Sequence, residues 1–186
     1  MSLSSRLLRA LPARALHRSF TSSAPLLGRA IVYTTPGSPS TVLTALTTPS
    51  LPPTPPPAHL NVRFLLSPIN PADINVIEGV YPSKPTATDA LTQEGLGSEG
   101  KPVFVGGNEG LAQVVAVGAS GAGESGGFRV GDWVIVTKQQ SGTWMSERCI
   151  PAVDVAKIPE TPSGQKLTEV QAATLTVSAI PRVQLK

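Results

Sequence analysis

The fold is decided by Leu-Ala-Gln-Val-Val-Ala-Val-Gly at residues 111–118 and by Asp-Trp-Val-Ile-Val-Thr at residues 132–137. Both runs are short and rich in aliphatic, β-branched residues, a composition that favours buried strands. Between them, four of the seven residues at 121–127 are glycine, which is typical of a turn. The stretch therefore predicts two successive strands joined through a glycine-rich turn.

Further strand signals lie on the N-terminal side of this pair. A β-branched run at residues 30–35 and a second run at residues 41–47 flank the turn cluster Pro-Gly-Ser-Pro-Ser at residues 36–40, as in a hairpin. Residues 59–67 alternate polar and apolar side chains, as a half-buried strand does. We therefore expect three strands before the central pair.

The C-terminal side continues the pattern. Strands are predicted at residues 143–150 and 153–158, and a helix over residues 167–176, where Thr168 and Gln171 have the spacing of an N-terminal cap. Turn residues and a shortage of large apolar side chains predict a long loop over residues 83–102. Short strands at close spacing with glycine turns indicate a mainly β fold, a small β-barrel.

The composition excludes several classes of protein. Charged residues make up 15% and hydrophobic residues 40% of the 186 residues, so the chain is not a charged disordered tail. Its single cysteine, Cys149, forms no intrachain disulfide, and we expect it to be a small buried apolar residue of a strand. One cysteine and two histidines cannot make a four-cysteine or a two-cysteine, two-histidine zinc site. No apolar run reaches the roughly 18 residues of a transmembrane segment.

The positive charge gathers at the start of the chain. Residues 1–29 contain five arginines, several serines and no acidic residue, and the first acidic residue is Asp73. Beyond residue 29, ten basic residues stand against twelve acidic ones, so no nucleic-acid partner is expected. Leucines near helical spacing among arginines predict a mitochondrial transit peptide at residues 1–29 and import into the matrix. The alternative is a disordered basic tail.

One segment has a more specific order of residues, Pro-Ile-Asn-Pro-Ala-Asp-Ile-Asn-Val-Ile-Glu-Gly-Val-Tyr-Pro-Ser-Lys-Pro at residues 68–85. Four motifs follow it in order: Gly-Gly-Asn-Glu-Gly at 106–110, Val-Gly-Asp-Trp-Val-Ile at 130–135, Gly-Thr-Trp at 142–144 and Gln-Ala-Ala-Thr-Leu-Thr-Val at 171–177. Over about residues 30–177 the chain resembles the medium-chain dehydrogenase/reductase superfamily. Within it, the motifs are most similar to the mitochondrial enoyl-thioester reductases of fungal type.

The resemblance implies a domain organisation. Residues 30–165 would form the GroES-like, partly open β-barrel catalytic domain of that superfamily, and residues 166–186 the start of a linking helix with a divergent tail. In the family a Rossmann domain continues from this helix, but no glycine pattern of the GxGxxG kind follows a strand and opens a helix here. We therefore expect a truncated form with the Rossmann domain missing, in which the cofactor-binding residues cannot be assigned.

The resemblance also implies a reaction, the NADPH-dependent reduction of trans-2-enoyl thioesters in mitochondrial fatty acid synthesis. The substrate would be an enoyl thioester on acyl carrier protein or coenzyme A. Hydride addition to the β-carbon places negative charge on the thioester carbonyl oxygen, which requires a nearby donor that keeps its proton. A tyrosine hydroxyl keeps its proton near neutral pH, and the resemblance makes Tyr81 this catalytic group.

Four more residues bear on the site. Asn70 and Asp73 suit a turn that their side chains organise, and both could also line the site near substrate or cofactor. The resemblance places Trp144 near substrate and nicotinamide, whereas an indole also suits packing inside the barrel. Zinc-dependent relatives have a metal-binding histidine where this chain has Asn108, so no catalytic zinc is expected.

Two other functions stay open at this point. The chain could be a non-enzymatic GroES-like barrel remnant, or a quinone reductase of the same superfamily. The Tyr81 motif favours the enoyl-thioester reductases over the quinone reductases. Because the family's dimer surface lies on the Rossmann domain, a homodimer is expected only for a full-length form.

Overall fold

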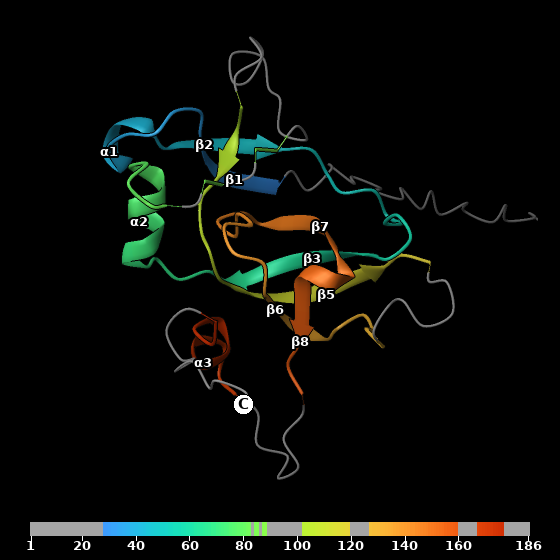
Figure 1. The fold of residues 1–186 in the computed structure, drawn as a ribbon. Coiled ribbons are helices and arrows are strands. Elements are labelled where there is room, and N and C mark those ends of the chain that lie inside the picture. The colour runs from blue at the N-terminus through green and yellow to red at the C-terminus, as the bar shows by residue number, and fades with distance from the viewer. Residues whose placement is uncertain are drawn as a thin grey trace, which may run out of the picture.

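The structure, a computed structural model, describes residues 28–82, 84–85, 87–88, 102–119, 127–159 and 167–176. These residues form two antiparallel sheets, with helices α1 and α2 beside them (Figure 1). The greater part of the predicted transit peptide, the glycine-rich turn before Gly127, most of the predicted loop at 83–102 and the tail after Thr176 lie outside the described residues.

The smaller sheet has the strand order β2-β1-β4. Its strands are β1 (Gly28–Tyr33), β2 (Thr44–Thr48) and β4 (Phe104–Val105). The predicted hairpin is confirmed, because β1 pairs antiparallel with β2. Its second strand begins three residues later than predicted, because the one-turn helix α1 (Pro39–Val42) precedes it. Pro39 at the start of α1 has a φ angle already suited to a helix.

The larger sheet contains the central pair of strands in the order β7-β3-β5-β6-β8. Its strands are β3 (His59–Leu66), β5 (Leu111–Val117), β6 (Trp133–Val136), β7 (Glu147–Pro151) and β8 (Val155–Lys157). The predictions for β3, β5 and β6 are confirmed to within one residue at each end. The prediction for β7 is wrong at its start, because the chain turns at Gly142, whose φ is 75°. A 3₁₀ turn at Ala152–Asp154 shortens the next predicted strand.

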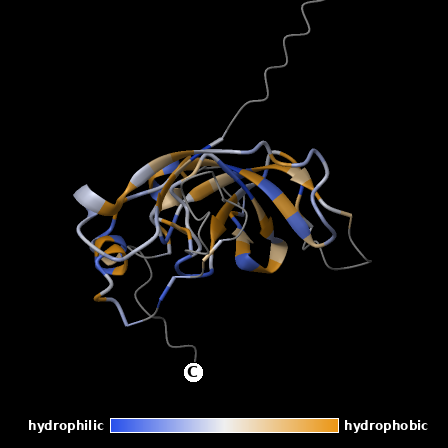
Figure 2. Ribbon diagram, turned by 90° about the horizontal axis from the view of Figure 1, so that it is seen from above, coloured by the Kyte–Doolittle hydropathy of each residue, from blue (hydrophilic) through white to orange (hydrophobic). Residues whose placement is uncertain are grey.

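The main hydrophobic core lies on one side of the larger sheet. Its buried side chains include Leu60, Val62, Ala112, Val114, Val134, Val136 and Ile150. Hydrophobic and hydrophilic residues alternate along strands of the sheets (Figure 2), as expected for strands with one face inside. Aliphatic side chains therefore supply most of this core, in line with an aromatic content of only 4%.

Two further helices carry residues of the sequence motifs, and only one of them was expected. Helix α2 (Pro71–Ile77) lies in a segment for which no helix was predicted. Helix α3 (Glu169–Ala173) confirms the helix predicted at 167–176, although it is shorter, and Thr168 Oγ1 caps it by accepting from the Gln171 N–H at 3.3 Å. No helix in the described ranges combines the length and apolar character of a membrane span.

Candidate active site

Four polar residues meet where the start of α2 contacts the glycine-rich turn at residues 106–110, and we call them the polar junction. They are Asn70, Asp73, Asn108 and Glu109. Asp73 Oδ2 accepts from the Asn70 N–H at 2.7 Å, and Asp73 Oδ1 accepts from Asn108 Nδ2 at 2.6 Å. Asn70 Nδ2 donates to Glu109 Oε1 at 2.9 Å. The turn-forming role considered for Asn70 and Asp73 is therefore confirmed, as the N-terminal cap of a helix.

The carboxylates of the polar junction are out of water. Asp73 is 1% exposed and Glu109 is completely buried. Burial raises the pKa of Asp73, hydrogen bonds from Asn70 and Asn108 oppose that change, and the neighbouring Glu109 adds to it. Because a buried carboxylate needs its lone pairs satisfied, the amide donors of Asn70 and Asn108 are what make this arrangement tolerable.

Glu109 joins three distant segments. Besides its bond to Asn70, its Oε2 accepts from Thr176 Oγ1 at 3.0 Å, just beyond α3. Its main-chain oxygen accepts from Thr143 Oγ1 at 2.7 Å. Glu109 was assigned no role from the sequence, although an acidic residue between glycines and ahead of a buried strand is a signal that it needs buried partners.

Trp144 packs on the same turn. Its ring lies against Gly106 and Gly107, where a Cβ atom on either glycine would collide with the indole. Gly107 also has a φ of 93°, a conformation that L residues with side chains rarely adopt. The indole Nε1 donates to the Pro68 carbonyl at 3.1 Å. Trp144 is therefore a packing residue of the barrel, held next to the segment that leads to Asn70.

Tyr81 lies apart from these two residues. It lies in the segment after α2, beyond the C-cap residue Glu78, and its N–H donates to the Asn75 carbonyl at 3.1 Å. Tyr81 is half-buried. The whole of α2, seven residues or about 10 Å of helix, separates its segment from Asn70. The structure thus brings Asn70 and Trp144 close together and places Tyr81 at the far end of the same helix.

Two observations bear on metal and substrate. The Asn108 amide is bonded at both ends within the protein: Nδ2 donates to Asp73, and Oδ1 accepts from the Gln140 N–H at 3.0 Å. Among the described residues, no three acidic, histidine or cysteine side chains cluster as metal ligands. Beside Trp144 lies an open hollow of about 540 Å³, mostly apolar, which Phe64, Leu66 and Ile69 also line.

The sheet arrangement and the turn that holds Trp144 define the class of this chain. It has the fold of the GroES-like barrel, the catalytic domain of the medium-chain dehydrogenases/reductases, as expected from the motifs. Over most of its length it is similar to the amino-terminal part of the mitochondrial enoyl-acyl carrier protein reductases, so the resemblance drawn from the sequence is confirmed.

Two such relatives give the extent of the match. The chain is 38% identical over 165 residues to the enzyme from Schizosaccharomyces pombe and 39% identical over 152 residues to that from Yarrowia lipolytica. These alignments cover 86% and 82% of this chain, but 39% and 36% of the relatives. The chain therefore spans about two fifths of the length of the relatives it matches. No protein-family model matches the sequence.

Solved structures give the same picture. The mitochondrial 2-enoyl thioester reductase heterodimer Etr1p/Etr2p from Candida tropicalis has a TM-score of 0.69 at 34% identity, covering 81% of this chain and 40% of that one. A complex of Etr1p with NADP and crotonyl-CoA has a TM-score of 0.70 at 33% identity, covering 82% and 41%. A Bacillus thuringiensis protein described as an NADPH:quinone reductase is more distant, with a TM-score of 0.57 at 26% identity.

Proposed function

We propose that this chain is the barrel part of an NADPH-dependent reductase of trans-2-enoyl thioesters, the acyl group being carried by acyl carrier protein or coenzyme A. The observation that carries the proposal is similarity to enoyl-acyl carrier protein reductases over more than four fifths of the chain. A solved relative, Etr1p, was crystallised with NADP and crotonyl-CoA. The quinone reductase alternative is weaker, since that match is less similar in both sequence and fold.

In the proposed reaction, Tyr81 acts on the oxygen of the thioester. NADPH, when bound, supplies the hydride that adds to the β-carbon, and the α-carbon takes up a proton, so that the C=C double bond becomes single. Negative charge develops on the carbonyl oxygen during this step, and the Tyr81 hydroxyl donates a hydrogen bond to it. If the hydroxyl then gives up its proton, solvent restores it. The main-chain N–H of Tyr81 is bonded to the Asn75 carbonyl, which supports a fixed position of its backbone near the end of α2.

Asn70 and Trp144 would shape the part of the site at the start of α2, away from Tyr81. The Trp144 N–H is already used by the Pro68 carbonyl, so its contribution is a flat apolar wall beside the hollow that Leu66 and Ile69 line. A wall of this kind suits an acyl chain rather than a polar group. Asn70 is held by Glu109, so its place depends on the polar junction.

The described residues do not fit the whole of NADPH. Their strands pair only antiparallel, and none of them leads through a glycine-rich turn into a helix that could hold a pyrophosphate. We propose that the barrel faces the nicotinamide end only. The remaining contacts, and the surface for a homodimer, would belong to a Rossmann domain in a full-length form.

The proposal includes the location and the metal content. Residues 1–29 would direct the protein to the mitochondrial matrix and be removed there, and the relatives are named as mitochondrial. No zinc would be needed, because Asn108 is engaged at both ends of its amide. N-terminal sequencing of protein from purified mitochondria, and elemental analysis of the same sample, test the two statements. Recovery of Met1, or of one stoichiometric zinc, would contradict them.

The central experiment joins this barrel to the part of the Schizosaccharomyces pombe relative that its match does not cover. In this chimera, Tyr81→Phe is expected to lower turnover of crotonyl-CoA about a hundredfold or more, because one donor to a developing oxyanion is lost. NADPH binding, followed by fluorescence, should stay nearly unchanged. Unaltered turnover would remove Tyr81 from the mechanism.

The chain offers a matched control, because it contains only two tyrosines. Tyr33→Phe makes the same chemical change at a residue of β1 and should leave turnover within about twofold. The 186-residue chain by itself is expected to show no NADPH oxidation with crotonyl-CoA. A chimera that folds and binds NADPH but reduces no enoyl thioester would favour the non-enzymatic alternative.

A further inference from the structure

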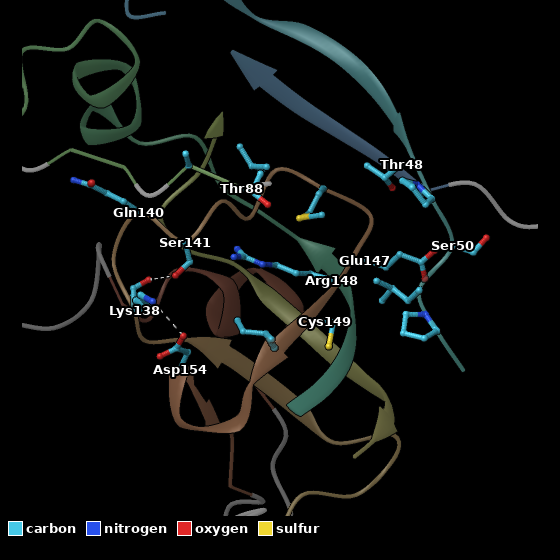
Figure 3. Close-up of a pocket in the computed structure, with 17 residues that line it drawn as sticks. Thr48, Ser50, Thr88, Lys138, Gln140, Ser141, Glu147, Arg148, Cys149 and Asp154 are labelled. Atoms are coloured by element: carbon cyan, nitrogen blue, oxygen red, sulfur yellow. Dashed lines mark hydrogen bonds and ion pairs between the residues drawn. The ribbon is translucent and has the colours of Figure 1, made fainter. Parts of the chain in front are cut away.

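A cavity of about 410 Å³ lies between the two sheets and has no place in the proposed reaction. It is lined from the smaller sheet by Thr48 and Val105, from β7 by Arg148 and Cys149, and from the segment before β7 by Lys138. Asn70, Tyr81 and Trp144 are not among its lining residues. Figure 3 shows the Arg148 side chain running across this cavity from β7 toward Ser141.

Arg148 carries a charge that is poorly compensated. Its guanidinium makes one hydrogen bond in the described part of the chain, from Nη1 to the Gly142 carbonyl at 3.3 Å. The ion pairs of that part join other residues, among them Lys138 with Asp154 at 3.5 Å. Burial lowers the pKa of Arg148, and the more distant Asp154 and Cys149 only partly offset this effect.

Arg148 is half-buried, and its guanidinium has donors to spare for an acceptor. It has five N–H donors in a rigid fork that matches the two oxygens of a carboxylate or a phosphate. Taking such a charge out of water is unfavourable unless it is paired and hydrogen-bonded. One bond to a carbonyl in the described part of the chain leaves donors of Arg148 available to a ligand in the cavity, whose volume falls in the range of small-molecule sites.

We propose that this cavity binds a small anion through a carboxylate or phosphate group seated on the Arg148 guanidinium. Lys138 at the rim adds a second cation, although Asp154 shares it. Glu147 and Asp154 also line the cavity and oppose an anion near them, so the ligand's charged group is expected on the Arg148 guanidinium itself. The proposal does not depend on the enoyl-thioester reaction.

Cys149 provides a reporter for the occupancy of the cavity. It is the sole cysteine of the chain, and it is half-buried rather than fully buried as expected from the sequence. It is among the residues that line the cavity, and Figure 3 shows its thiol apart from the Arg148 guanidinium. An anion that occupies the cavity should therefore slow the alkylation of Cys149 by restricting the access of a small neutral reagent such as iodoacetamide.

The experiment measures this alkylation rate on the full chain at fixed pH, with inorganic phosphate or acetate replacing chloride at constant ionic strength. At least one of the two anions should slow the reaction severalfold and saturably, and the comparison distinguishes a phosphate from a carboxylate site. Burial raises the pKa of the Cys149 thiol and Arg148 partly opposes that change, so each variant is compared only with itself, with and without anion.

Arg148→Met should abolish the protection, whereas Arg63→Met, at an exposed position of the adjacent strand β3, should retain it. Arg148→Lys keeps the charge without the fork and should need several times more anion for the same protection, which also covers the case of a poorly folding methionine variant. No saturable protection of the unmodified chain by either anion would overturn the proposal. Full protection in Arg148→Met would overturn it as well.

Discussion

The core of the larger sheet and the polar junction beside it are both buried, but different interactions hold them. The sheet core consists of aliphatic side chains from strands β3, β5, β6 and β7. The junction consists of amides and carboxylates that bond in pairs across α2 and the turn at 106–110. Apolar contacts are non-directional and scale with buried area, whereas hydrogen bonds require a donor opposite each acceptor.

The two regions should therefore fail differently when residues are changed. A trimmed core side chain loses transfer free energy and leaves a cavity, so its effect depends on volume. A junction residue contributes only about 0.5–1.5 kcal/mol per hydrogen bond, but a partner left unsatisfied and buried costs about 1–3 kcal/mol. The core is sensitive to size, and the junction is sensitive to the identity of single atoms.

The largest effect is expected in the sheet core. Ile150→Ala should lower the free energy of unfolding by about 2–5 kcal/mol, because Ile150 is 1% exposed and its neighbours cannot fill the space. The matched control, Ile69→Ala, changes a side chain that is 73% exposed and should stay within about 0.5 kcal/mol. Urea denaturation of both variants gives the comparison, and similar losses at the two positions would show that the sheet core does not dominate stability.

The junction comes next. Glu109→Gln keeps the shape but places an NH₂ group opposite one of two donors, Asn70 Nδ2 or Thr176 Oγ1. We expect a loss of about 1–3 kcal/mol, although the volume is unchanged. Glu78→Gln, at an exposed position after α2, should change stability by less than about 0.5 kcal/mol. Equal losses of unfolding free energy in Glu109→Gln and Glu78→Gln would mean that the hydrogen bonds of Glu109 stabilise the protein no more than an exposed side chain does.

The same contrast explains what the sequence could predict. The strands of the sheet core follow from local composition, so residues 59–67, 111–118 and 132–137 were placed to within one residue. Helix α2 was missed, although Asn70 and Asp73 have the spacing of a cap with proline between them, because its β-branched and asparagine residues do not favour a helix. The bonds of Glu109 to Thr143 and Thr176 link segments far apart in the chain, which no local pattern reveals. In the sequence, Arg148 is an ordinary polar residue of a predicted strand. Its place in a cavity depends on residues of the other sheet, such as Thr48 and Val105, which are far away in the chain.

A smaller effect should appear in the pH dependence of the junction. Burial raises the pKa of Asp73 above its ordinary value of 3.8, so the folded protein binds this proton more tightly than the unfolded chain. The resulting stabilisation is fully present below pH 3.8 and is lost as pH rises through the folded-state pKa. Asp73→Asn removes this titration, so its stability deficit relative to the unmodified chain should shrink as pH rises from 4 to 7. Denaturation at several pH values measures the deficit, and a deficit that grows with pH would reverse the sign of the shift.

The smallest effect concerns Tyr33, a residue of β1 in the smaller sheet that lines the same small hollow as Asp73 and Asn108 of the junction. The ring lies 5.3 Å from that of Phe104, a contact that Tyr33→Phe keeps. The hydroxyl is buried without a hydrogen-bond partner among the described residues, and burial raises its pKa to about 12, so at pH 7 it is a neutral donor that needs an acceptor. Removing the hydroxyl is expected to raise the free energy of unfolding by up to about 1 kcal/mol. The folded protein then no longer buries a polar group without a partner, while the apolar contacts of the ring are kept. Thermal and urea denaturation test the sign.

A hollow of about 10 Å³, close to the size of one water molecule, adjoins Tyr33, Asp73 and Asn108. A loss of stability in Tyr33→Phe would therefore show that a bound water completes the polar junction, and that the junction extends as far as β1.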